Sequence, residues 1–183
     1  RMKYTTAEEQ FMGVVPEWLF NAQADAFGAG ACRLVILGNN PTLLDGIDPK
    51  LISMAGAARG KAGKRLRDLV TNSASQWSIV GYATKEWATQ VFPELDADAA
   101  LEKLWDGIFK TARVSLDTDT IAEWEAHNSR LHARAKTMND HCFDGIQFVG
   151  DGTDLYVGLA DGHVWEGGSG LTEGGIPYNA NIP

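Results

Sequence analysis

Two short apolar segments, separated by a helical stretch, constrain the fold of this chain more than any other feature. The segments 33–37 ("RLVIL") and 77–83 ("WSIVGYA") are rich in branched apolar residues, which is typical of buried strands. Between them, Asp48 is placed to cap a helix that begins at Pro49 and runs to about Val70, although three glycines weaken it. A strand, a helix and a second strand in this order predict a parallel pair with a crossover helix.

Further helices flank the two strands. The segment 97–112 and the segment from about 118 to 138 each carry an apolar stripe at helical spacing, and Thr84 is placed to cap a short helix. A helix over 17–27 precedes the first strand, and the "GAGA" stretch ends it. Its expected apolar residues are Trp18, Leu19, Ala22 and Ala26.

After residue 145 the apolar period changes to two. The stretch "GIQFVGDGTDLYVGLADGHVWEGG" predicts short strands joined by turns at "GDGTD" and "ADGH". The predicted fold class is therefore α/β, a partly parallel sheet with crossover helices followed by a short β meander. Two parallel strands are few for such a sheet, so we expect residues 1–145 to form an α/β domain that lacks its first strands.

Composition narrows the class of protein. With 183 residues, 44% of them hydrophobic, the chain is long enough for one sizeable core. A net charge of −8 argues against nucleic acid as a partner, because phosphate binding needs a basic face. No apolar run is long enough to span a bilayer, so no membrane partner is expected. Cys32 and Cys142 are too few for a disulfide scaffold, and we predict buried free thiols in the cytoplasm.

One local exception to the acidic balance lies in "RGKAGKRLR". It brings five basic residues together on the predicted helix: Arg59, Lys61, Lys64, Arg65 and Arg67. A solvated helix face explains them. A phosphate-binding patch is the alternative, and it would make the chain a non-enzymatic binding or interaction module.

The residue types that usually carry catalysis form no recognisable constellation. The sequence contains no phosphate-binding loop, no zinc helix and no nucleophile elbow. Glu123 and His127 lie one helical turn apart and are able to share a metal ion, whereas His127 and His132 do not converge. We interpret both histidines as lying at the solvent edge of a helix whose other face carries Trp124.

The remaining candidates lie in loops. His141 lies with Asp140 and Asp144, and we interpret it as a loop histidine. His163 comes two residues after Asp161, where turn chemistry explains it. The aspartates of "GDGTD" do not have the spacing of a calcium loop. The residues alone therefore give no catalytic residue, no metal ligand and no identifiable substrate-binding residue.

Several runs read together carry a stronger signal. They are "GNNPTLLDGIDPKLI", "QWSIVGYATKEWATQVFPE", "LWDGIFKTARV", "WEAHNSRLHARAKTMN", "GTDLYVGLADGHVWEGG" and "GGIPYNANIP". In this order they resemble the family of aminopeptidase T, aminopeptidase S and PepS. The resemblance covers nearly the whole chain and implies a two-domain metalloaminopeptidase with an enclosed active site, which is typically a homodimer.

The resemblance also implies where the chemistry lies. In this family the Asn–Ile–Pro run is followed by a Thr-Glu-Glu segment that provides a metal ligand, and the other ligands lie further on. We therefore expect a truncated N-terminal domain that ends at Pro183, just before the first ligand, with residues 146–183 leading toward an absent catalytic domain. The parent would hold two divalent metal ions, such as zinc or cobalt, and cleave peptides. No ligand maps onto this chain, and neither His163 nor Glu166 is assigned as one.

Overall fold

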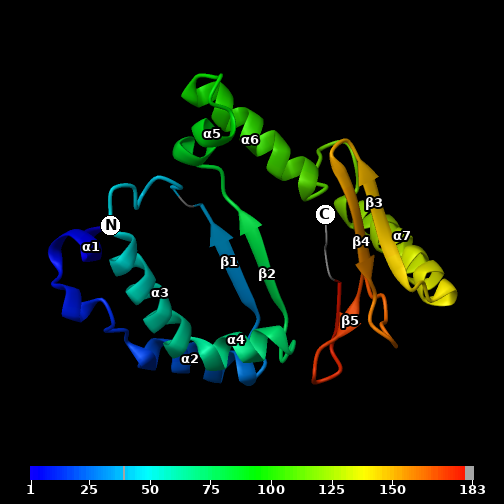
Figure 1. Ribbon diagram of the computed structural model, residues 1–183, viewed down its shortest axis with the longest axis horizontal. Coiled ribbons are helices and arrows are strands. Elements are labelled where there is room, and N and C mark those ends of the chain that lie inside the picture. Colours follow the sequence, from blue (N-terminus) through cyan, green and yellow to red (C-terminus); the bar gives the residue numbers. More distant parts are fainter. Residues whose placement is uncertain (39, 180–183) are drawn as a thin grey trace. The chain divides into compact units, whose positions relative to one another are not determined.

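The two predicted strands form a parallel pair. The computed structural model describes residues 1–38 and 40–179, so Asn39 and the last four residues of the "GGIPYNANIP" run lie outside the described residues. Strand β1 (Arg33–Leu37) pairs with β2 (Trp77–Gly81), with Arg33 opposite Trp77 and Leu37 opposite Gly81 (Figure 1). This arrangement confirms the parallel pairing that the order of elements predicted.

Two helices, rather than one, connect these strands. Helix α3 (Pro49–Ala62) begins at Asp48, whose carboxylate accepts a hydrogen bond from the Lys50 amide as predicted, and α4 (Lys64–Thr71) follows after one residue. The expected continuous helix is interrupted at Gly63, which packs against α2. A Cβ atom at Gly63 would lie 3.2 Å from the Phe20 ring. Glycine permits this close approach, and the helix breaks there.

Helix α2 (Glu17–Gly28) precedes β1, after the short helix α1 (Met2–Thr6) and the 3₁₀ turn η1 (Glu9–Phe11). Its predicted apolar face is wrong. The buried residues are Ala24 and Phe27, which pack against Leu66 of α4, whereas Trp18 is 72% exposed. Packing against α4 selects this face, because several overlapping stripes of the helix are apolar.

The largest cluster of buried residues lies beyond β2. Helices α5 (Lys85–Val91) and α6 (Ala97–Thr111) are capped by the side chains of Thr84 and Asp96. The core consists of Ala83, Ala88, Ala100 and Leu104, and the partly buried side chains around it include Trp87, Trp105 and Ile108. The predicted short helix after Thr84 and the apolar stripe of 97–112 are both confirmed.

The C-terminal elements are a long helix and a hairpin. Helix α7 (Thr120–His141) is followed by β3 (Gly145–Gly150) and β4 (Thr153–Gly158), which pair antiparallel around the "GDGTD" turn. No strand follows the "ADGH" turn directly in the described part of the chain, which corrects the sequence-based expectation. The next strands are β5 (Gly170–Leu171) and β6 (Pro177–Tyr178), which form a separate two-stranded sheet.

The structure divides into two compact units. The first contains Arg1–Ala112 with Leu171–Ile176, and the second contains Arg113–Gly170 with the residues from Pro177. The predicted domain boundary near residue 145 stays a prediction. None of the helices in the described residues is both long and apolar enough to cross a bilayer.

Both cysteines are free, but they are exposed rather than buried as predicted. Cys32 precedes β1, and Cys142 terminates α7 in the left-handed region at φ 46°.

Candidate functional site

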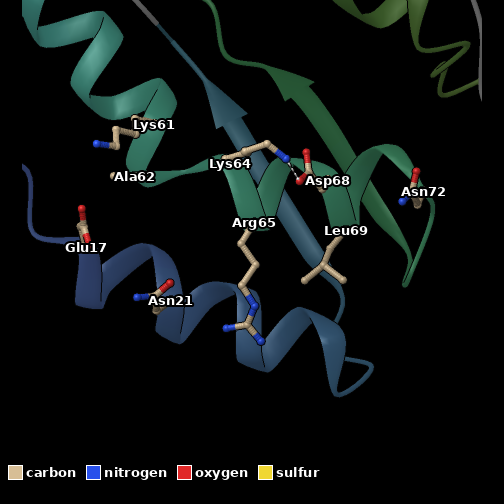
Figure 2. A pocket seen from close by; sticks show the side chains of 9 residues that line it. All are labelled: Glu17, Asn21, Lys61, Ala62, Lys64, Arg65, Asp68, Leu69 and Asn72. Atoms are coloured by element: carbon tan, nitrogen blue, oxygen red, sulfur yellow. Dashed lines mark hydrogen bonds and ion pairs between the residues drawn. The ribbon is translucent and has the colours of Figure 1, made fainter.

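The basic segment lies beside a groove in the first unit. Residues of the α3 C-terminus and of α4 form one wall, and Glu17 and Asn21 of α2 form the other (Figure 2). Figure 2 shows the Arg65 side chain extending from α4 toward α2. Lys61 lines the same groove from the end of α3. This groove is where a binding module would place its anionic ligand.

Nearby groups contact four of the five basic side chains, and two of these four contacts are with carboxylates. Arg65 Nη1 lies 2.5 Å from Asp25 Oδ1 of α2, and Lys64 pairs with Asp68 one turn along α4. Arg67 donates to the Gly60 carbonyl at 3.1 Å, and the Arg59 guanidinium lies 5.8 Å from the centre of the Phe20 ring. The carboxylates of Glu17 and Asp68 also line the groove. The pairing of Lys64 and Arg65 with carboxylates weakens the positive potential on which phosphate binding depends.

The histidine candidate His127 of α7 contacts an arginine and a tryptophan side chain. Arg113 Nη2 donates to His127 Nδ1 at 2.9 Å, and the Arg113 guanidinium lies 5.1 Å from the centre of the Trp124 ring. His127 is therefore half-buried beside Trp124, not at the solvent edge as predicted. Arg113 occupies Nδ1 of the His127 ring, and its positive charge repels a metal ion that Glu123 and His127 would share.

The other histidines are distributed over different parts of the second unit. His132 Nε2 lies 3.1 Å from Ser169 Oγ, and His141 stacks on the Phe143 ring at 5.1 Å between centroids. His163 Nδ1 lies 2.8 Å from the Ala160 carbonyl oxygen, so turn chemistry accounts for it. In the hairpin, Asp154 accepts a hydrogen bond from Gln147 at 2.8 Å.

No three histidine, cysteine, aspartate or glutamate side chains come together as a metal site within residues 1–38 and 40–179. A structural zinc site has four protein ligands, and a catalytic zinc site has three. The described residues by themselves therefore do not form a complete zinc site of this kind.

One polar contact in the second unit was not anticipated from sequence. Asn139, near the end of α7, donates through Nδ2 to the Trp165 carbonyl at 2.9 Å and accepts the Trp165 amide at 2.7 Å. The two groups are 26 residues apart, and no local pattern links them. Trp165 is thereby held at the side of a mostly apolar groove that Leu131, Met138 and Ile146 also line.

Comparison with known proteins assigns the chain to a family. All of it, residues 1–183, matches the family described as thermophilic metalloprotease (M29). The chain belongs to the M29 metalloprotease family. This confirms the family predicted from the ordered sequence runs, because the relatives of this M29 chain include aminopeptidase T, AmpS and PepS.

The relatives are much longer than the M29 chain. Aminopeptidase T of Thermus thermophilus is 39% identical over 183 residues, which are 100% of this chain and 45% of that protein. Aminopeptidase AmpS of Bacillus subtilis is 32% identical over 183 residues, which are 44% of its length. The solved structure of wild-type AmpT from Thermus thermophilus matches with a TM-score of 0.88 at 38% identity, covering 98% of this chain and 43% of that one. The chain therefore spans less than half the length of these relatives.

The predicted α/β fold class is confirmed by this match. The family is one of metalloproteases, and no three side chains able to ligate a metal come together in the described residues of this M29 chain.

Proposed function

We propose that this M29 chain forms the N-terminal, non-catalytic part of a metal-dependent aminopeptidase that releases N-terminal residues from peptides. Its relatives are aminopeptidases, and their chains are more than twice as long. The observation that carries the proposal is that the four histidines, His127, His132, His141 and His163, make separate contacts. In the part of the chain that the structure describes, none of them belongs to a group of three possible metal ligands. The metal ligands then belong to chain outside residues 1–183.

The proposed parent binds two divalent ions, such as zinc or cobalt, acts on peptides in the cytoplasm and is a homodimer. The role proposed for this chain is to shape the substrate chamber and contribute to the dimer contact. The alternative of an anion-binding module is less favoured, because Arg65 and Lys64 of the basic groove are already paired with carboxylates.

The test compares the 183-residue chain with the longer protein encoded by its source reading frame. Both are assayed for release of p-nitroaniline from amino-acid p-nitroanilides, with zinc or cobalt added and with a chelator. We expect turnover by the longer protein, its loss with chelator, and no turnover by the chain. Metal binding to the chain is measured separately by equilibrium dialysis, and we expect none at micromolar metal.

Two results would contradict the proposal. Chelator-sensitive turnover by the chain that is lost in His127→Gln, but kept in His163→Gln, would place a catalytic metal site on α7. A longer protein that is inactive with every divalent metal would exclude the aminopeptidase assignment.

A further inference from the structure

A serine and a histidine side chain meet in the second unit. Ser169 Oγ lies 3.1 Å from His132 Nε2, and both residues are exposed to solvent. When the ring proton is on Nδ1, Nε2 accepts a hydrogen bond from the serine hydroxyl. A histidine at this distance is able to act as the general base of a serine nucleophile.

The chain before Ser169 allows the loop to lie directly against the histidine ring. Gly168 has a φ of 91°, and a Cβ atom there would lie 2.4 Å from Cδ2 of the His132 ring. Any other residue at this position would therefore displace the ring or the loop. The approach of Ser169 to His132 depends on this glycine.

A third polar group is available to orient the ring. Asn128 lies one helical turn before His132 on α7, where side chains are neighbours. It is only 7% exposed, and its Oδ1 has no hydrogen-bond partner in the described part of the chain. An acceptor at this place is suited to hold the Nδ1 proton of His132, which keeps Nε2 free to receive the serine proton.

A hydroxyl donor lies beside the residue that follows the serine. Strand β5 begins at Gly170 and pairs with β6, and a Cβ atom at Gly170 would lie 2.7 Å from the Tyr178 hydroxyl oxygen. Tyrosine hydroxyls are among the donors that stabilise the negative oxygen formed when a serine attacks a carbonyl group. The histidine, the asparagine, the serine and the tyrosine all belong to the second unit.

From this arrangement we infer that Ser169 is the nucleophile of a metal-independent acyl-transfer site for small activated esters. Ser169 Oγ bonds to the ester carbonyl carbon while His132 Nε2 takes the hydroxyl proton and Tyr178 donates to the carbonyl oxygen. The bond between the carbonyl carbon and the leaving oxygen then breaks, and the alcohol leaves with the proton from His132. Water attacks the acyl-serine with His132 again as the base, which releases the carboxylic acid and returns a proton to Ser169. Asn128 is a positioning residue, because it acts through His132.

This activity is separate from the metal-dependent peptide hydrolysis proposed above. An anilide is a much more basic leaving group than a phenolate, so the site reacts with aryl esters and leaves p-nitroanilides intact. Failure of the ester experiment therefore does not bear on the aminopeptidase proposal. In the same way, a longer protein without aminopeptidase activity would leave the ester site untouched.

The test measures acylation of the 183-residue chain in the presence of a metal chelator. One probe is p-nitrophenyl acetate, which releases p-nitrophenolate. The other is a fluorophosphonate, which loses fluoride to the serine oxygen and is located by mass spectrometry. We expect the label on Ser169 and not on Ser129, which is exposed on α7 but donates to the Glu125 carbonyl at 2.9 Å. In Ser169→Ala, the rate of p-nitrophenolate release should fall to that of buffer.

Variants of the other residues separate catalysis from a structural contact. We expect His132→Ala to lower the acylation rate about 100-fold, as loss of a general base implies, and added imidazole to restore part of the rate. His163→Ala is the control and keeps the full rate, because His163 lies against the Ala160 carbonyl oxygen. Asn128→Asp retains the acceptor and should keep the rate, whereas Asn128→Leu should lose most of it.

Three outcomes overturn the inference. The first is labelling that is spread over several residues without preference for Ser169. The second is an unchanged rate in Ser169→Ala. The third is a rate in His132→Ala that is unchanged, or that is lowered and not restored by imidazole, because the hydrogen bond then only fastens the loop to α7.

Discussion

Replacing Asn139 by alanine removes both hydrogen bonds that hold the backbone of Trp165. The side-chain amide of Asn139 donates at 2.9 Å and accepts at 2.7 Å, much as a neighbouring strand would. A hydrogen bond of this kind contributes about 1 kcal/mol net, so the loss of two costs about 2 kcal/mol. Alanine favours the helix by about 0.6 kcal/mol over asparagine, which leaves a net destabilisation of about 1.4 kcal/mol.

The matched control is Asn21→Ala, because Asn21 is an exposed residue within α2 and the helix-propensity gain is the same. The free energy of unfolding of each variant is measured by urea denaturation, followed by far-UV circular dichroism. We expect a difference of about 2 kcal/mol between the two variants. Exchange of the Trp165 amide should accelerate in Asn139→Ala only. A difference below about 0.5 kcal/mol, the usual effect of a surface substitution, would refute the reasoning.

Two other predictions follow from the packing and from the lysine pKa values. Leu104→Ala, in the α5–α6 core at 8% exposure, should cost about 2–4 kcal/mol in urea denaturation, whereas fully exposed Leu116→Ala should change stability by less than about 0.5 kcal/mol. Equal effects of the two would contradict the assigned core. The Glu9 carboxylate accepts a hydrogen bond from Lys50 at 2.5 Å and raises the pKa of that lysine, as Asp98 does for the pKa of Lys85. The interaction that raises the lysine pKa in the folded state stabilises that state at pH values below the ordinary lysine pKa of about 10.4. This contribution is lost as the pH rises past the raised pKa, because the lysine then loses its charge in the folded state as well. The stability difference between the wild type and Lys50→Met should therefore shrink above that pH, and a difference that grows would be contrary to the assigned pair.

The sequence by itself determined the elements whose signals are local. A helix cap such as Asp48 or Thr84 accepts hydrogen bonds from amides two or three residues away, so its position can be predicted from the neighbouring residues in the sequence. The same holds for the two apolar strands and for the hairpin turn. The ordered runs also predicted the family. They did not predict individual site residues, and the absence of mapped metal ligands stays a prediction.

Tertiary structure alone decided which faces and partners these elements use. Helix α2 carries several apolar stripes, and only contact with α4 selects Ala24 and Phe27 over Trp18. The Arg65–Asp25 pair joins residues 40 positions apart, and Asn139 reaches Trp165 across 26 positions. Local propensity extends over one helical turn or one strand pair, whereas these contacts depend on how whole elements pack together. For that reason the sequence revealed the order of the elements, and the three-dimensional structure was needed to show that Lys64 and Arg65 pair with carboxylates and that β1 pairs with β2 only among the described residues.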